Sequence, residues 1–398
     1  YNVNPYWEVY KNSNSSKKAQ FRFNGKVVWN ITQHLRVQGT AGAELNWFTF
    51  EDYKAPTTPG YESGYLQNNN FRNRMYNFEL LALYNNSWGN FDFNATLGGN
   101  LYKVNNQTIV TTAKDMKIRD VVALMSFNEV SVEPHSYRKQ INSIYGAVNL
   151  GWKHMLYFDA TLRGDQSSTL PISNNMYIYP SFSGSFVFSE LLKLGDKLPY
   201  GKVRMSWAQV GSDTDPYQLG LVYTKSKFAY PGYTIGYISN GTIPNKDLKP
   251  TKTNSFEMGL ELKFLKNRIG LDFTYYSQLS KNQIMGMASS STSGYGYRLI
   301  NAGELENKGV EIALNTRPIQ TKDFSWDLNF NFSKNSNKVK KLVDDMDMFE
   351  LEKATWLDVQ VAAKVGENFG SIVGPDFQRN ENGDILIDPS TGLPMYDK

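Results

Sequence analysis

The sequence contains no cysteine, only three histidines and no run of eighteen apolar residues. The absence of cysteine excludes disulfides, thiolate metal sites and cysteine nucleophiles together, and it leaves the cellular compartment open. The absence of a long apolar run excludes a membrane-spanning helix. A transmembrane β-barrel escapes that test, because its strands turn apolar side chains to lipid only at every second position.

Evidence for catalysis is also absent. No G-x-S-x-G, H-E-x-x-H or phosphate-binding glycine loop occurs. His34, His135 and His154 lie far apart in the sequence, which argues against a metal triad. We therefore expect no enzymatic activity, no catalytic residue, no metal and no cofactor. The net charge of +4 is small and its cations are scattered, so we expect no nucleic-acid partner.

Two acidic segments are expected to be solvent-exposed and not to form catalytic or metal sites. Asp344 and Asp345 lie in a charged loop region, where they are expected to be hydrated. The stretch Asn380–Asp388 (NENGDILID) offers oxygen ligands and a glycine, but it lacks the spacing of a calcium-binding EF-hand loop. A plain turn is favoured there over a calcium site.

Aromatic residues are abundant, at 14% of the 398 residues. Asparagine and serine are also frequent, while the helix formers alanine and glutamate are sparse, a composition that favours strands and turns. The length would suit two or three ordinary domains or one large β-structure.

The chain reads as a series of hairpins, because apolar and polar residues alternate with period two over many segments. Between residues 18 and 29, for example, Phe21, Phe23 and Val27 alternate with Arg22 and Lys26. We predict about twelve strands, at residues 18–29, 35–47, 76–86, 91–102, 141–152, 156–165, 181–189, 202–210, 255–264, 269–275, 308–316 and 326–333.

Loop lengths differ between the two ends of the predicted hairpins. Connections within a hairpin are mostly short, whereas those between hairpins, at 48–75, 103–140, 211–254 and 278–305, are long. Short periplasmic turns and long extracellular loops are typical of outer-membrane barrels. A soluble sandwich is the alternative, but charged residues such as Arg22, at the polar positions of the alternation, do not suit its core.

Four tryptophans are expected at strand ends or turns, where an indole would lie at the lipid headgroup level. The alternative is that they cap a soluble core. They are Trp29, Trp47, Trp88 and Trp152.

Four segments in order resemble the barrel motifs of SusC-like (starch-utilisation, RagA/SusC type) TonB-dependent outer-membrane transporters. Two shorter motifs, NPYW at Asn4–Trp7 and RGDQSS at Arg163–Ser168, add to the resemblance. The four are Tyr179–Glu190 (YPSFSGSFVFSE), Gly201–Gly211 (GKVRMSWAQVG), Leu248–Gly259 (LKPTKTNSFEMG) and Asn301–Glu311 (NAGELENKGVE).

The resemblance implies an all-β fold, a transmembrane antiparallel barrel of twenty-two strands filled by an N-terminal plug. Residues 1–398 are then expected to be a partial barrel, with the plug domain and the C-terminal strand outside the covered sequence. It also implies a multi-pass protein of the Gram-negative outer membrane, surrounded by lipid, that imports a glycan or peptide. TonB, through the plug, and a SusD-like lipoprotein are the implied partners. A passive channel or a surface-binding scaffold is the alternative.

Two sets of side chains follow from these interpretations. Apolar residues expected to face lipid are Phe21, Phe23, Phe256, Met258, Leu260, Leu271 and Phe273, with Arg22, Glu257 and Asp272 facing the lumen. Aromatic loop residues expected to contact substrate are Tyr230, Tyr233, Tyr237, Tyr295 and Tyr297. Their flat rings offer apolar faces and their hydroxyls fix orientation. Packing of the loops, or contact with the lipoprotein, is the alternative role for these tyrosines.

Overall fold

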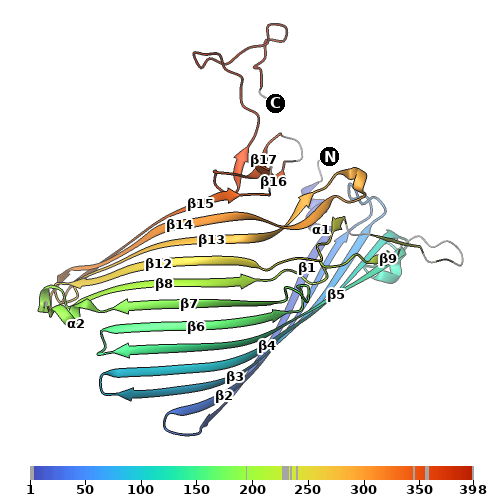
Figure 1. Cartoon of the computed structure of the whole chain (residues 1–398). Helices are drawn as coiled ribbons and strands as arrows, with labels where there is room; N and C mark the ends of the chain where they lie inside the picture. The colour runs from blue at the N-terminus through green and yellow to red at the C-terminus, as the bar shows by residue number, and fades with distance from the viewer. Residues whose placement is uncertain are drawn as a thin grey trace.

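One mostly antiparallel sheet of 13 strands dominates the computed structural model (Figure 1). The structure describes residues 4–193, 195–225, 233, 235–238, 241–343, 346–354 and 358–396. Twelve long strands follow one another around the sheet, each overlapping one predicted strand, so the predicted set is confirmed. They are β1 (Ser13–Asn30), β2 (Leu35–Lys54), β3 (Tyr65–Trp88), β4 (Phe91–Met116), β5 (Phe127–Trp152), β6 (Leu156–Ser167), β7 (Met176–Phe186), β8 (Tyr200–Ser212), β12 (Thr251–Phe264), β13 (Ile269–Ala288), β14 (Tyr297–Gln320) and β15 (Ser325–Lys341).

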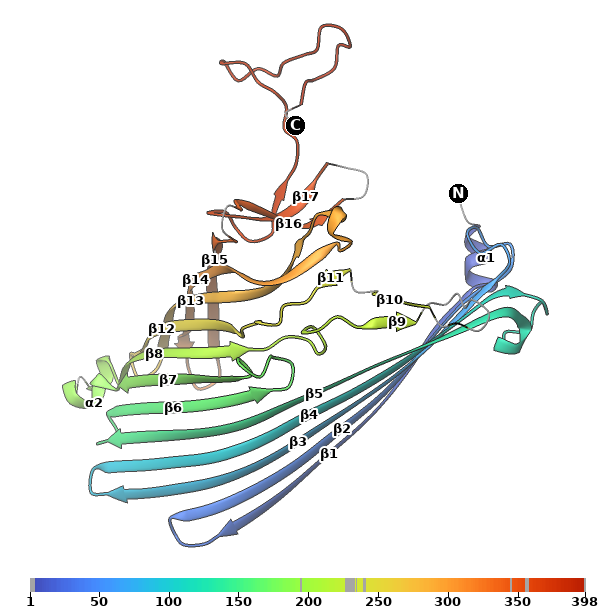
Figure 2. The same ribbon diagram turned by 45° about the vertical axis from the view of Figure 1, so that its right-hand side comes forward.

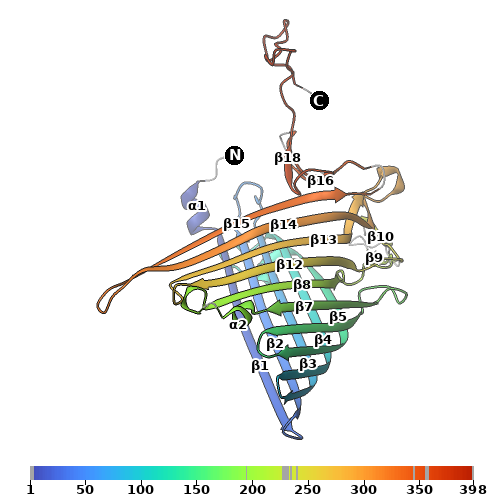
Figure 3. The ribbon, with the colours of Figure 1, turned by 60° about the vertical axis from the view of Figure 1, so that its left-hand side comes forward.

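The sheet is strongly curved, so that β1–β5 and β8–β15 form the two sides of a trough (Figures 2 and 3). The short strand β11 (Thr242–Ile243) adds to β14 in parallel. This arrangement is a barrel-type wall. Among the residues that the structure describes, no helix has the length and apolar character needed to cross a membrane.

The two faces of the sheet differ in polarity, as the alternation predicts. Ion pairs lie on the polar face, where Arg22 contacts Glu44 at 2.8 Å and Arg204 contacts Asp272 at 2.8 Å. On the opposite face, strand register aligns apolar side chains in rows. One such row is Leu35, Tyr84, Ala95, Val148, Ala160, Phe182, Trp207 and Phe256.

Three of the four predicted long loops are wrong. Residues 48–75, 103–140 and 278–305 are mostly strand, and their connections shrink to 55–64, 117–126 and 289–296. The alternation fails there because the face that is apolar lower down also becomes polar, as at Asn70 and Asn105, while the backbone pairing continues. Trp47 accordingly lies inside β2 and not at a strand end.

The connection between β8 and β12 is the long loop that the structure retains, at residues 213–250. It contains the hairpin of β9 (Tyr223–Lys225) and β10 (Gly236–Ile238). We call the end of the sheet that bears this loop the upper rim. The lower rim has tight turns, such as the one at Lys153 and His154, which both have positive φ, as tight hairpins prefer.

Small elements cover the rims. Helix α1 (Pro5–Tyr10) sits on the upper rim, where Trp7 packs against a small core at the tips of β2–β5 and donates to Thr58 Oγ1 at 2.9 Å. The other short helices are α2 (Phe188–Leu192), η1 (Leu124–Ser126), η2 (Gly195–Lys197) and η3 (Ser291–Ser293).

A three-stranded sheet of β16 (Met348–Lys353), β17 (Gln360–Lys364) and β18 (Ser371–Val373) follows β15 at the upper rim. It is joined to the main sheet by a core that contains Val339, Leu342 and Ala363. Residues 374–396 then form an arm that projects away from the curved sheet (Figure 1).

Candidate functional site

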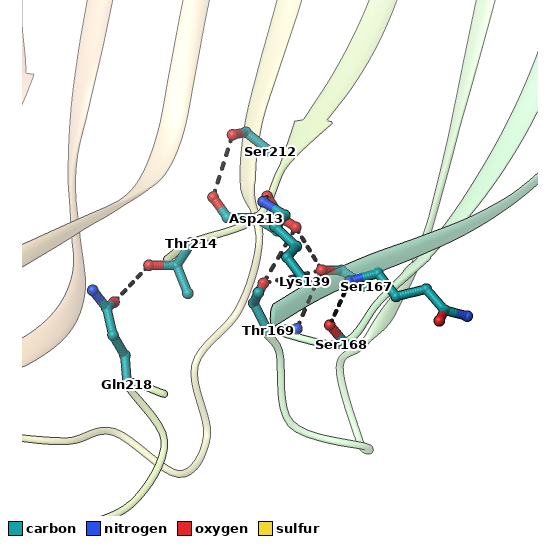
Figure 4. A network of polar contacts seen from close by, with 9 residues as sticks. Lys139, Ser167, Ser168, Thr169, Ser212, Asp213, Thr214 and Gln218 are labelled. Carbon is teal, nitrogen blue, oxygen red and sulfur yellow. Dashed lines mark hydrogen bonds and ion pairs between the residues drawn. The ribbon is translucent and has the colours of Figure 1, made fainter. Parts of the chain in front are cut away.

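The long loop 213–250 begins at a clamped aspartate. Asp213 accepts a hydrogen bond from Lys139 Nζ on β5 at 2.6 Å, from Ser167 Oγ at 2.5 Å and from Thr169 Oγ1 at 3.2 Å (Figure 4). Its side chain is only 10% exposed. A carboxylate with an ammonium and two hydroxyl donors is well satisfied, so the start of the loop is fixed to β5 and to the end of β6.

The same loop ends at a second clamp. The Asn301 carboxamide on β14 accepts from the backbone N–H of Lys249 at 2.8 Å and donates to the carbonyl of Lys249 at 2.7 Å. This pairing imitates a strand ladder. Asn301 also donates to the carbonyl of Asn282 at 3.1 Å. Its side chain therefore ties β13 and β14 to the end of the loop.

An apolar core lies between the two clamps. Leu248 is fully buried there with Leu170, Tyr177 and Leu299. A Cβ atom on Gly211 would come within 2.4 Å of the Tyr177 ring, so glycine at this position lets the ring lie flat against β8. Motif residues that are far apart in the sequence thus meet at the base of one loop.

A polar groove opens beside this base. Its volume is about 670 Å³, and it lies between the start of the loop and the upper part of β13. Ser212, Thr214, Asp215, Gln218 and Gln283 line it with hydroxyl, carboxylate and carboxamide groups. Such groups suit hydrogen bonding to a hydrated ligand.

The charge balance of the groove is slightly negative. Lys139 also lines it, but its ammonium is neutralised by Asp213. Asp215 forms no ion pair with any residue that the structure describes. Within the described part of the chain, its carboxylate is therefore a charge at the groove without an ion-pair partner.

A ladder of polar side chains crosses the polar face below the groove. Arg163 on β6 lies over the ring of Tyr145, 5.1 Å from its centroid, and donates to Asp165 at 2.9 Å. Tyr145 on β5 passes over Gly98 on β4 and donates to Glu79 on β3. Tyr179 on β7 donates to Asp165. The RGDQSS motif therefore contributes to a network across five strands.

The four predicted tyrosines that the structure describes do not line this groove. Tyr230 is not among the described residues. Tyr233 is 74% exposed, and Tyr297, at the start of β14, is 54% exposed. Tyr295 is half-buried. Tyr237 lies in β10 opposite Thr224, so its expected place in an irregular loop is wrong.

Sequence reasoning missed the residues that form the groove and its clamps. Lys139 and Ser167 lie 74 and 46 residues before Asp213 in the sequence, so no local spacing connects them. The sequence feature that could have pointed to the groove was the position of Asp213 and Asp215 shortly after the Gly201–Gly211 motif.

Metal ligation finds no support in the described part of the chain, which holds no group of three or more His, Asp or Glu side chains placed for an ion. In the stretch proposed as a turn or a calcium site, Asn380 Oδ1 accepts from the backbone N–H groups of Asn382 at 3.0 Å and Asp384 at 2.9 Å. Its oxygen is therefore used to close a turn. Asp344 and Asp345 are not described.

Comparison with known proteins places the fold. A family model described as TonB dependent receptor-like, beta-barrel, matches residues 1–364. TonB-dependent receptor P3 of Formosa agariphila is 27% identical over 392 residues, which are 94% of this chain and 38% of that protein. TonB-dependent receptor SusC of Bacteroides thetaiotaomicron is 26% identical over 383 residues, 87% of this chain and 37% of that protein.

Solved structures agree on the architecture. The RagAB peptide transporter matches with a TM-score of 0.84 at 20% identity, over 98% of this chain and 43% of that one. The siderophore receptor PiuA of Acinetobacter baumannii matches with a TM-score of 0.53 at 14% identity, over 82% of this chain and 48% of that one. The chain spans less than half of the length of each of these four proteins.

Proposed function

This chain belongs to the TonB-dependent receptors, whose β-barrels lie in the outer membrane, and from that premise we propose that it forms part of an active importer of a large nutrient. In such barrels the apolar face of the wall meets lipid and the polar face meets the lumen. The groove beside loop 213–250 then lies on the luminal side of the upper rim, where an incoming molecule arrives first. Its polar walls are the observation that carries the proposal.

We propose that the groove holds an oligosaccharide or a peptide through hydrogen bonds to Gln218 and Gln283. The double substitution Gln218→Ala/Gln283→Ala should weaken binding of the transported nutrient about tenfold or more, since two hydrogen-bonding groups are lost. Binding is measured on the full-length receptor by calorimetry. Gln33→Ala, in a lower-rim turn, is the matched control and should leave the affinity unchanged. An unchanged affinity in the double variant would contradict the site.

The predicted tyrosines of the upper rim are a second proposed contact surface for the nutrient. Because Tyr237 belongs to a paired strand, Tyr233→Ala is the cleaner test than Tyr237→Ala. We expect it to reduce binding while the amount of receptor in the outer membrane stays constant. Unchanged binding would leave Tyr233, Tyr237, Tyr295 and Tyr297 as loop-packing or partner-contact residues.

TonB, acting through a plug, and a SusD-like surface lipoprotein are the proposed partners of the whole receptor. The sequence similarity to SusC and the cover of small elements on the upper rim support this proposal. Purification of the full-length receptor in mild detergent should recover the lipoprotein. Uptake should stop in cells that lack TonB, whereas uptake that continues would favour a passive channel.

A further inference from the structure

A cluster of cations stands on the apolar face, just above its apolar band. Arg72 and Arg74 on β3 share the parity of Phe78 and Leu80, so all four side chains leave the same face of the sheet. Lys103 on β4 lies opposite Tyr76, diagonal to Arg74. We call Arg72, Arg74 and Lys103 the cationic cluster.

The three cations lack a counter-ion within the described part of the chain. Among the residues that the structure describes, none of them forms an ion pair; Arg74 donates to Gln107 at 2.9 Å. Glu51, the carboxylate of the same parity on β2, lies opposite Asn68. That position is four residues beyond Arg72, about 13 Å along the strand.

On the opposite side of the trough, formed by β12–β14, the same outward face carries cations with carboxylate partners. Lys281 contacts Glu304 at 3.2 Å and Lys308 contacts Glu306 at 3.3 Å. These two cations are therefore neutralised by the protein itself. The cationic cluster lacks such carboxylate partners among the described residues.

The height of the cluster matches the lipid headgroups. From Trp88 to Tyr76 the outward positions of β3 are mostly apolar or aromatic. This span is about 40 Å along the strand and, with a tilt of about 45°, about 28 Å across the membrane, close to the hydrocarbon thickness. Arg74 and Lys103 each come two residues above the last residue of this band, Tyr76 on β3 and Leu101 on β4.

An apolar hollow of about 880 Å³ lies directly below the cluster on the same face. Phe78, Leu80 and Leu101 wall it, and Gly39, Ala41 and Gly99 form its floor. A Cβ atom on Gly39 would meet no heavy atom within 4 Å. The hollow is therefore open towards the space that lipid chains occupy.

We propose that the cationic cluster and this hollow together bind a phosphorylated glycolipid of the outer leaflet. The two guanidinium groups and the ammonium bind phosphate through charge-assisted hydrogen bonds. An acyl chain of the same lipid fills the hollow. The proposal depends on the outer-membrane position of the wall and not on the transported nutrient.

The test uses the full-length receptor and lipid A as the probe, with bound lipid counted by native mass spectrometry. The triple variant Arg72→Gln/Arg74→Gln/Lys103→Gln should lower the affinity for phosphorylated lipid A at least about tenfold. The control variant Lys252→Gln/Lys281→Gln/Lys308→Gln removes the same charge from the other side of the wall. It should change the affinity for phosphorylated lipid A by less than about twofold. Dephosphorylated lipid A should bind all three proteins equally weakly.

A third variant tests the hollow without changing charge. Gly39→Leu places a side chain in open space. The unheated variant should therefore still migrate on gels as a folded, heat-modifiable barrel, while its lipid A binding falls. Wild-type affinity in the triple variant, or equal binding of dephosphorylated lipid A, would overturn the proposal. Competition by inorganic phosphate as effective as lipid A itself would also overturn it. Nutrient binding, measured on the same variants, should be unchanged because the cluster and the groove lie on opposite faces.

Discussion

Single glycines decide how the polar ladder crosses the wall. A Cβ atom on Gly98 would come within 2.4 Å of the Tyr145 ring, whereas one on Gly39 would meet nothing within 4 Å. Both residues lie inside strands. The same substitution is therefore expected to have different effects at the two positions.

Gly98→Ala should displace Tyr145 from Glu79 and destabilise the barrel by about 1–3 kcal/mol, from steric strain and a lost hydrogen bond to a charged group. Gly39→Ala is the matched control and should be neutral or slightly stabilising, because alanine loses less conformational entropy on folding. Urea unfolding in detergent measures both. Equal midpoints for the two variants would mean that Tyr145 moves aside without cost.

Elements at the upper rim are held by polar contacts, and their stability should depend on pH. Lys54 Nζ donates to Glu8 Oε1 at 2.9 Å, and this hydrogen bond, with that from Asn12, lowers the pKa of the Glu8 carboxyl. A carboxyl whose pKa is lower in the folded state stabilises that state above its ordinary pKa of 4.5. The contribution is lost as the pH falls through the lowered value.

We therefore expect acid to release α1 from the rim. The fluorescence of Trp7, taken as the difference between wild type and Trp7→Phe, should report its loss of packing during an acid titration. Glu8→Gln should remove this pH dependence. The same acid transition in Glu8→Gln would assign it to another group.

The loop clamp is a second prediction at this scale. Asp213→Asn leaves Lys139 without its counter-ion and should favour local opening of the start of the loop by about 1–3 kcal/mol. Hydrogen exchange of residues 213–222 measures the opening. Asp215→Asn, which breaks no ion pair among the described residues, should leave exchange unchanged.

The elements were predictable to different degrees for a physical reason. Strands within the apolar band were predicted because lipid and lumen impose alternation, as at Phe21, Arg22 and Phe23. Their extensions were missed because water bathes both faces around Asn70. The clamp at Asp213 could not be predicted, because its partners come from other strands and no local pattern records such a meeting.

At the scale of the whole molecule, the apolar band predicts where a charge is tolerated. Leu80→Arg, on the lipid face within the band, should cost about 2–4 kcal/mol. Asn70→Arg, on the same face of the same strand but above the band, should cost little. Both predictions are checked by the fraction of receptor that is folded in the outer membrane, which is judged by heat-modifiable mobility on gels. Equal assembly of the two variants would contradict the position of the band.

The upper edge of the wall is uneven, because β2–β5 continue far above the apolar band while β6 and β7 end near Ser167 and Met176. A bulky molecule that diffuses over the cell surface thus meets rigid paired backbone on one side and a single short connection, residues 168–175, on the other. Capture is then limited by the direction of approach. A bulky label on residues 168–175 should slow association of the nutrient, whereas the same label at the upper ends of β3 and β4 should not. The dissociation rate should be unchanged in both cases.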